Sequence, residues 1–556
     1  MFTRRRTLPK GTLVLTLLAL TIFLLGISKL KNANTNTKIH DWLPFHQDDT
    51  DSKPASNIKC KDQSLEFLRT LEPSLYLTDT FTFSRKCIKP IYTPDLPRES
   101  ITNISSSFFS SRNPQPEVSF STCSSSTRLP PCDVLALPVP EPYPTEHNKY
   151  EHLLFGVAST YERIQSSLPA FKHWLAGTSA RLVIVISDAS RLPPKFTLAD
   201  LEVQYRRAGI LATVIPPRIK TALPRKGGEK QRRKADNKDR MMPVEELHFL
   251  LVQDLVERAD DEEGGKKKTK WLGIVDDDTF FPSLYKLDEA LRRYDYREKV
   301  WLGALADDWY SLTLFGHQAF GGAGIFLSLP LASALYPHLH SCIFNSRSKT
   351  GDSLLRDCIA AHTSTTLTIL PGLNQHDLRS DASGFFESNP SPLLSIHHWK
   401  SWYKAPVVSI SQVTKVCGDC LLRRYLFQDD DVVWVNGYSV NKYKKGVLQG
   451  LDMEKVEGTW EGAFSDALSS LEQEEEEGNK KGVGGGGGGG FEFAYGGLRA
   501  KLGEKERRRW KIVDARFVDD PDSGKRLLRQ VYVWYDSERG DGEKGKDRVV
   551  EVIWEV

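Results

Sequence analysis

The sequence has little excess charge of either sign, because 75 Lys and Arg residues stand against 72 Asp and Glu in 556 residues, a formal net charge of +3. An extended basic surface for nucleic acid is therefore not expected. The chain also lacks a GxGxxG dinucleotide fingerprint, since its glycine turn reads Gly321-Gly-Ala-Gly324. No second CxxC and no zinc-spaced His pair accompanies Cys417-Gly-Asp-Cys420, which favours a tight disulfide over half a zinc site.

Charged residues are also absent from the apolar stretch Leu13–Ile27, which follows the basic cluster Arg4-Arg-Arg6. With its neighbours the stretch approaches the roughly 20 residues that span a bilayer, and the basic cluster favours a cytosolic N-terminus. We therefore expect a cytosolic tail over residues 1–10, a transmembrane signal anchor over 11–30, and a lumenal location for the remainder. A cleaved signal peptide is the alternative, and either reading sends the chain into the secretory route.

Eight cysteines, an even number, fit an oxidising compartment in which all of them can pair. Their connectivity cannot be deduced from the sequence. Proximity along the chain suggests the pairs Cys60–Cys87, Cys123–Cys132, Cys342–Cys358 and Cys417–Cys420. The clear N-glycosylation sequon is Asn103-Ile-Ser105, in a Ser-rich stretch that we expect to be exposed.

Composition divides the rest of the chain into four parts. Residues 31–60 are polar and suit a flexible stem, whereas residues 61–148 mix short apolar pieces with Ser and Pro clusters, which indicates a disulfide-tied irregular lead-in. The main domain covers residues 149–428. Residues 429–556 have the pattern of a small β-rich appendage, interrupted by a low-complexity insert at 471–490 that we expect to be disordered.

The main domain opens with a strand, a helix and a second strand. Buried-strand patterns at Leu153–Ala158 and Arg181–Asp188 flank a helical pattern over Tyr161–Ala176, and another helix is expected over Pro243–Arg258. The basic segment Lys220–Arg240 lacks apolar periodicity and is expected to be a solvated loop. Apolar strands that alternate with helices predict an α/β fold with a mostly parallel mixed sheet, which binds ligands at the carboxyl ends of its strands.

Three consecutive carboxylates, Asp276, Asp277 and Asp278, end the apolar strand that begins at Trp271. Clustered Asp oxygens are hard ligands that suit Mg²⁺ or Mn²⁺, and such ions keep open positions for diphosphate oxygens. The triplet therefore indicates chemistry on a phosphate-bearing substrate such as a nucleotide sugar. A solvated acidic turn is the alternative interpretation of these three residues taken alone.

Five segments, in this order, together resemble the Fringe-like β-1,3-glycosyltransferases of family 31. They are Val275–Phe280, Trp301–Ala304, Phe320–Gly324, Gly351–Cys358 and Leu394–Trp399. The resemblance covers roughly residues 150–405. It implies a GT-A nucleotide-sugar-binding fold as the catalytic domain over 149–428, a UDP-sugar donor, and Mn²⁺ as the metal with Mg²⁺ as second choice. It also implies a single-pass type II Golgi membrane enzyme with a lumenal catalytic domain.

By motif position, the resemblance implies that Asp278 is the direct metal ligand, with Asp276 and Asp277 near the ribose and the metal's water shell. Asp276 is also a candidate ligand. A downstream histidine completes the coordination in the family, which indicates His397 first and His398 second. The remaining cofactor-binding residues implied by the resemblance are Ala158 and Ser159 under the uridine, and Gly321, Gly322 and Gly324 along the donor-sugar and acceptor side of the cleft.

An inverting transfer needs a carboxylate that removes the acceptor hydroxyl proton. The resemblance indicates Asp352 as this base and Asp357 as the fallback, while a helix N-cap is the structural alternative for Asp352. The expected reaction moves galactose, or N-acetylglucosamine or glucose, from a UDP-sugar to an acceptor glycan hydroxyl in a β-1,3 linkage. A catalytically inactive lumenal protein that binds carbohydrate or nucleotide sugar is the alternative class, and a two-metal phosphohydrolase ranks last.

Overall fold

In the computed structural model, all described residues belong to one compact unit within Asp51–Val556. The described residues are 60, 62–109, 115–121, 129, 132–144, 149–218, 242–259, 268–348, 350–388, 392–461, 494–520, 524–536 and 545–556. The predicted tail, anchor and stem up to residue 59, the basic loop and the low-complexity insert lie outside them. Within this described part of the chain, no helix is long and apolar enough to cross a membrane.

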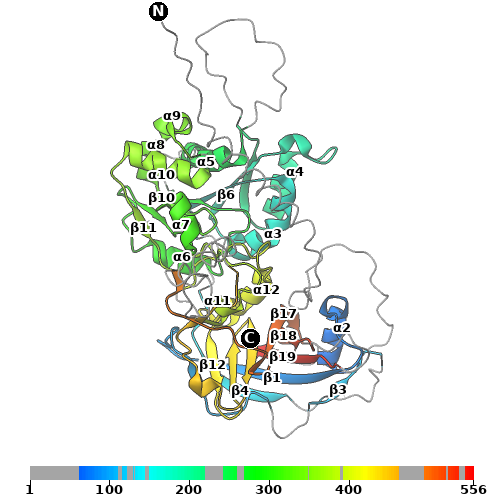
Figure 1. Ribbon diagram of the computed structural model, residues 1–556. Helices are drawn as coiled ribbons and strands as arrows, with labels where there is room; N and C mark the ends of the chain where they lie inside the picture. Colours follow the sequence, from blue (N-terminus) through cyan, green and yellow to red (C-terminus); the bar gives the residue numbers. More distant parts are fainter. Residues whose placement is uncertain are drawn as a thin grey trace, which may run out of the picture. The chain divides into compact units, whose positions relative to one another are not determined.

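A seven-stranded mixed sheet forms the centre of the predicted main domain (Figure 1). Its strands lie in the order β11-β9-β10-β8-β5-β6-β7, and β10 runs antiparallel to both of its neighbours while the other pairs are parallel. The strands are β5 Leu153–Ser159, β6 Arg181–Ile186, β7 Leu211–Ile215, β8 Trp271–Ile274, β9 Trp301–Gly303, β10 Ile325–Ser328 and β11 Leu367–Ile369. The predicted mixed, mostly parallel α/β architecture is confirmed.

Both faces of this sheet are covered, which explains why its strands are apolar at consecutive positions. On one face, Leu154, Leu272 and Leu327 belong to a core that also contains the buried leucines of α5. On the other face, the Phe155 ring packs 4.9 Å from Trp174 of α3, measured between ring centroids. The helices are α3 Tyr161–Leu175, α4 Leu198–Arg207, α5 Val244–Ala259, α6 Leu284–Leu291, α7 Trp309–Phe315, α8 Leu329–Leu335, α9 Leu339–Asn345, α10 Gly351–His362, α11 Ser383–Ser388, α12 Val407–Ile410 and α13 Thr414–Cys417, with short 3₁₀ turns η1 Ala189–Arg191, η4 Tyr336–His338, η5 Ser411–Val413 and η6 Leu448–Gly450.

A second, ten-stranded sheet combines both ends of the described chain. It runs in the order β2-β12-β13-β14-β17-β18-β19-β1-β3, and β4 pairs with β1. Helix α2, Gln63–Leu75, packs on it through Leu65, Leu68 and Leu71. Its strands are β1 Phe81–Tyr92, β2 Thr102–Ile104, β3 Glu117–Val118, β4 Asp133–Val139, β12 Arg424–Phe427, β13 Val432–Val435, β14 Ser439–Tyr443, β17 Arg507–Asp519, β18 Arg526–Trp534 and β19 Arg548–Glu555, and a separate pair joins β15 Val456–Glu457 to β16 Leu498–Arg499.

The prediction of a small C-terminal appendage is therefore wrong in its extent. The segment expected to be an irregular lead-in supplies four strands, and β1 pairs with β19 in parallel from Thr82 opposite Arg548 to Ile88 opposite Trp554. A strand can be predicted from its own residues, but the strand that pairs with it depends on the tertiary fold. Pairing between segments far apart in the sequence therefore cannot be predicted from local patterns. Strands β13, β14, β17, β18 and β19 do lie within residues 429–556, the region whose pattern predicted β-structure.

Three disulfides join described cysteines: Cys87–Cys132, Cys342–Cys358 and Cys417–Cys420. The last two confirm their predictions, whereas the predicted pairs Cys60–Cys87 and Cys123–Cys132 are wrong. The parallel register of β1 and β4 places Lys86 opposite Asp133, so Cys132 lies beside Cys87 with their Cα atoms 5.8 Å apart. Cys60 is also disulfide-bonded.

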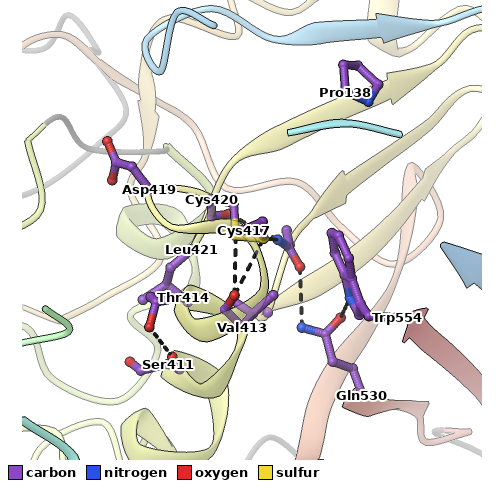
Figure 2. The surroundings of a disulfide bond; sticks show 12 residues. Pro138, Ser411, Val413, Thr414, Cys417, Asp419, Cys420, Leu421, Gln530 and Trp554 are labelled. Atoms are coloured by element: carbon purple, nitrogen blue, oxygen red, sulfur yellow. Dashed lines mark hydrogen bonds between the residues drawn. A yellow bond between two sulfur atoms is a disulfide. The ribbon is translucent and has the colours of Figure 1, made fainter. Parts of the chain in front are cut away.

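The Cys417–Cys420 disulfide is buried where α13 leads towards the second sheet (Figure 2). The Asn436 side chain donates a hydrogen bond to the Cys420 carbonyl at 3.1 Å, and Gln530 and Trp554 continue the polar contacts beside it. Both sulfurs are engaged in the bond, so the zinc alternative for this CxxC motif does not apply. The disulfide instead closes a tight turn at the junction between the α/β domain and the strands that follow.

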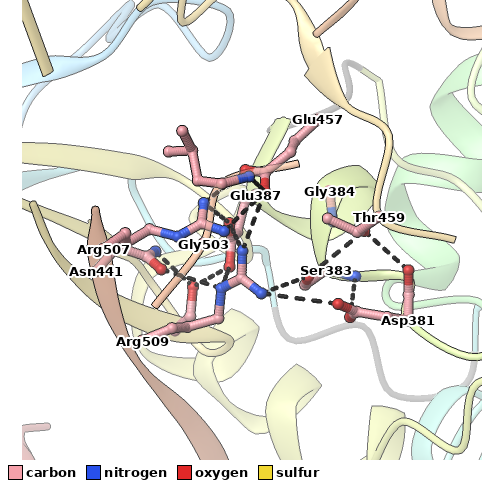
Figure 3. Close-up of polar contacts among 12 residues, drawn as sticks. Asp381, Ser383, Gly384, Glu387, Asn441, Glu457, Thr459, Gly503, Arg507 and Arg509 are labelled. Atoms are coloured by element: carbon pink, nitrogen blue, oxygen red, sulfur yellow. Dashed lines mark hydrogen bonds and ion pairs between the residues drawn. The ribbon is translucent and has the colours of Figure 1, made fainter. Parts of the chain in front are cut away.

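Buried ion pairs connect α11 of the α/β domain to the second sheet (Figure 3). Arg507 of β17 makes two hydrogen bonds to Glu457, at 2.6 and 2.8 Å, and Arg509 contacts Glu387 of α11 at 2.6 Å. Burial raises the pKa of Glu457, but Arg507 outweighs it and holds that pKa below its ordinary value. The network holds α11 in place, and α11 follows the segment 375–377 that contacts His397.

The substitution Glu457→Gln should lower the free energy of unfolding by about 3 kcal/mol, because it leaves the buried Arg507 guanidinium without its bidentate partner. Urea denaturation would measure the change. Glu117→Gln provides the control, since it removes an ion pair with Lys546 whose two side chains are each about half exposed and should cost at most about 1 kcal/mol. Equal losses for the two variants would contradict the stabilising role of the buried network.

Candidate active site

The Asp triplet lies where predicted, at the carboxyl end of β8 and beside the end of β5. Asp277 accepts hydrogen bonds from the Ser159 hydroxyl and from two nitrogens of Arg163, at 2.7 and 2.6 Å. Thr160 caps α3, so the chain turns from β5 into the helix and brings Arg163 over the triplet. The structure thus joins Ser159 to Asp277, whereas the neighbouring Ala158 packs against the hydrophobic core on the α5 face.

His397 is brought to the triplet by an isolated β-bridge between Phe280 and Ile396. Its Nε2 lies 3.2 Å from Asp278 Oδ1 and 3.6 Å from Asp276 Oδ2. Asp278 and His397 are buried, at 4% and 2% exposure, and their ligand atoms form one group with those of His398 within 4.8 Å. The Nε2 atom of His397 therefore lies within 3.6 Å of carboxylate oxygens of both Asp278 and Asp276, at the rim of the sheet.

A neighbouring segment fixes the orientation of the His397 ring. His397 Nδ1 lies 2.9 Å from the Gln375 carbonyl oxygen, which leaves Nε2 to face the carboxylates. Two residues further on, the backbone N–H of Asp377 donates to Asp307, and that of Asp307 donates back to Asp377, both at 3.1 Å. His398 turns differently, with its ring stacked 4.0 Å from Trp402 and its Nε2 3.7 Å from Asp377.

The electrostatics of the site follow from burial and close opposite charges. Burial raises the pKa of Asp278, but His397 outweighs it and holds that pKa well below the ordinary range. Burial lowers the pKa of His397, yet Asp278 and Asp276 raise it to about 9. Burial raises the pKa of Asp276. Asp278 and His397 thus stabilise each other's charged forms, and a divalent ion bound here would replace the proton of the ring.

The glycines at 321 and 322 are required by close packing against two histidines. A Cβ at Gly322 would overlap the His397 ring, and a Cβ at Gly321 would lie 2.6 Å from Cε1 of His248 on α5. Thr279, just after the triplet, donates a hydrogen bond to the Gly322 carbonyl at 2.9 Å. Gly324 has φ of +99° and faces the ring of Phe281, so it serves the turn and the aromatic core.

Asp352 lies in the first turn of α10, across the glycine turn from the triplet. The helix has Thr350 at its N-cap position, so the N-cap alternative for Asp352 is wrong. Its carboxylate accepts hydrogen bonds from the Gly321 N–H at 3.2 Å and from His248 Nε2 at 3.1 Å. The fallback base, Asp357, instead pairs with Arg356 at 2.7 Å and with the Ser346 hydroxyl.

Three residues of this site were not identified from the sequence: His248, Arg163 and Lys400. Burial lowers the pKa of His248, but Asp352 and Asp276 raise it to about 9. Lys400 Nζ donates to the Ser166 and Ser167 hydroxyls of α3 and lies 3.5 Å from the Asp277 carbonyl oxygen. A single histidine inside an amphipathic helix has no local pattern that indicates a role in a site. Arg163, in contrast, lies four residues after the end of β5, and this position could have suggested that it belongs to the site.

A family model described as "Protein of unknown function, DUF604" matches residues 311–412, a span that includes the glycine turn, Asp352 and His397. No curated protein matches the chain. The family model covers less than half of the chain, so it does not by itself assign the whole chain to that family.

Solved structures similar to this chain include three glycosyltransferases. GlyE of Streptococcus pneumoniae TIGR4 shares 12% identity with a TM-score of 0.23, over 40% of this chain and 45% of that chain. Mouse xyloside xylosyltransferase 1 in its apo form shares 12% with a TM-score of 0.25, over 48% and 94%. A glycosyltransferase involved in the glycosylation of the major capsid of PBCV-1 shares 9% with a TM-score of 0.23, over 44% and 94%. The chain thus spans less than half of the first of these proteins, and similarity at this level carries no functional inference.

Gly322→Ala should displace His397 from the triplet, because the added methyl group would occupy the position of its ring. We expect Mn²⁺ affinity, measured by titration calorimetry, to fall by about 10- to 100-fold, the usual effect of disturbing the surroundings of metal ligands. Gly450→Ala is the control, since a methyl group there meets nothing within 4 Å. Unchanged Mn²⁺ affinity in a folded Gly322→Ala protein would contradict the packing argument.

Proposed function

We propose that this chain is a metal-dependent inverting glycosyltransferase with a GT-A type catalytic domain, akin to the Fringe-like enzymes of family 31. It transfers a hexose from a UDP-sugar to a glycan hydroxyl and forms a β-1,3 linkage, with galactose as the first candidate and N-acetylglucosamine or glucose next. The observation that carries the proposal is the convergence of Asp278, Asp276 and His397 at the carboxyl end of β8, with Asp352 across the glycine turn.

The donor set fits a divalent cation of the size of Mn²⁺ or Mg²⁺. Neighbouring ligands of an octahedral ion with bonds of about 2.1 Å lie about 3 Å apart, and the 3.2 Å between His397 Nε2 and Asp278 Oδ1 is close to that spacing. Carboxylate and imidazole donors both suit Mn²⁺. Asp278, Asp276 and His397 would hold the ion, which when bound supplies positive charge opposite the departing diphosphate.

The chain's own groups supply the remaining functions. Asp352, 20% exposed at its side chain, is the group proposed to accept the proton of the attacking hydroxyl. Arg163 and Lys400 bring positive charge to the Asp277 edge of the site, where diphosphate oxygens would be neutralised. Asp277 itself is engaged by Ser159 and Arg163, which supports a role in shaping the nucleotide side of the site.

The cellular setting is part of the proposal. The basic cluster and the apolar stretch within residues 11–30 support a single-pass type II Golgi membrane enzyme whose catalytic domain faces the lumen. The three disulfides between described cysteines agree with an oxidising compartment.

Asp278→Ala should abolish manganese-dependent turnover, because it removes the buried carboxylate that lies closest to His397. The measurement is UDP release from a panel of UDP-sugars, with and without Mn²⁺, by the purified lumenal part of the chain. UDP binding in the presence of Mn²⁺ should be lost as well. Turnover at the wild-type rate in this variant would refute the proposed metal site.

Asp352→Asn should leave the binding of UDP and Mn²⁺ within about twofold of wild type and lower kcat for transfer by about 100-fold or more, the usual contribution of a general base. Asp357→Asn is the matched control, because its side chain pairs with Arg356 outside the site and its kcat should be unchanged. If the wild-type protein binds UDP and Mn²⁺ but transfers no sugar from any donor, the chain is a binding protein instead.

A further inference from the structure

An alternating series of carboxylates and imidazoles runs from the metal site to the proposed base. Asp278 contacts His397, His397 contacts Asp276, and Asp276 Oδ1 lies 3.6 Å from Nδ1 of His248. His248 Nε2 then lies 3.1 Å from Asp352 Oδ1. His248 is thus the one residue of this series to which the proposed function assigns no task.

The His248 ring is held tightly on both sides. Gly321 and Gly351 leave room for it, because a Cβ at Gly321 would lie 2.6 Å from Cε1 and a Cβ at Gly351 would lie 2.8 Å from Cδ2. The ring sits on α5, whose buried residues Leu247 and Leu251 anchor the helix in the core beside it. A side chain confined in this way presents its Nε2–H in one direction, towards Asp352.

We propose that His248 is a positioning residue that orients the Asp352 carboxylate for attack by the acceptor hydroxyl. This inference rests on the proposed function. His248 donates to Oδ1 and the Gly321 N–H donates to Oδ2, so both oxygens are fixed and rotation of the short Asp side chain is prevented. Each carboxylate oxygen has two lone-pair directions, which leaves one direction on each oxygen for the acceptor hydroxyl.

The His248 ring lies closer to Asp352 than to Asp276. The contact with Asp352 has hydrogen-bond length, whereas the 3.6 Å between Nδ1 and Asp276 exceeds it. The loss of His248 should therefore affect the acceptor reaction more than donor binding. A misplacement of a reacting group by about 1 Å can reduce the rate by about 100-fold, so a free Asp352 side chain is expected to be costly.

Two amide substitutions test the proposal. In His248→Gln the side-chain nitrogen reaches about as far as Nε2 and can still donate to Asp352, whereas in His248→Asn it reaches only as far as Nδ1. We expect His248→Asn to lower kcat by about 30-fold and His248→Gln to stay within about threefold of wild type. The dissociation constant of UDP with Mn²⁺, measured by calorimetry, should stay within about twofold for both variants.

His152→Ala is the matched control, because His152 forms a comparable pair with Asp288 at 2.7 Å near the start of β5. Its kcat should be unchanged, and thermal unfolding of all variants would monitor the fold. Equal losses of kcat in His248→Gln and His248→Asn would overturn the positioning role. Loss of UDP and Mn²⁺ binding in His248→Asn would also overturn the positioning role, because it would show that His248 supports the metal site instead.

The wild-type protein separates failure of this inference from failure of the proposed function. If it binds neither UDP nor Mn²⁺, or binds both without transferring sugar, the proposed function fails and the positioning role fails with it. If the wild type transfers sugar and Asp352→Asn does not, the two His248 variants decide the inference alone.

Discussion

The site depends on one buried contact, the approach of His397 to Asp278 and Asp276. The carboxylates follow β8, and the histidine lies more than a hundred residues later, next to Ile396, whose bridge to Phe280 brings it to the triplet. Asp278 and His397 are both buried, and two ionisable groups can share a buried volume only if opposite charges or a cation balance them. This balance lowers the pKa of Asp278 and raises the pKa of His397. Everything proposed about the reaction requires that arrangement.

The rest of the α/β domain makes room for this contact and holds it in place. The glycine turn allows two imidazoles to lie against the backbone, and the hydrogen bond from Thr279 ties the turn to the triplet. Behind His397, the chain near Gln375 supports the ring and continues into α11. The ion pairs from α11 to β17 then fasten that segment to the second sheet, which gives the ten-stranded sheet a structural part in the site.

Much of the α/β domain could be predicted from the sequence. The strands at β5, β6 and β8 and the helix α5 appear where apolar runs and periodicity indicated, because a parallel sheet buried on both faces imposes its pattern on each element separately. The position of the triplet at a strand end follows from the same local pattern. The roles assigned to Asp276, Asp278, Asp352 and His397 stay predictions, and the structure adds that these four side chains lie in one neighbourhood.

The sequence by itself determined elements of the α/β domain and the acidic strand end, because these depend on residues that are close along the chain. Only the tertiary structure decided the pairing of β1 with β4 and β19, the partner of Cys87, and the position of His248 between Asp276 and Asp352. These contacts join segments far apart in sequence. Their geometry is set by packing of the whole fold, which leaves no trace in the local pattern of any one segment.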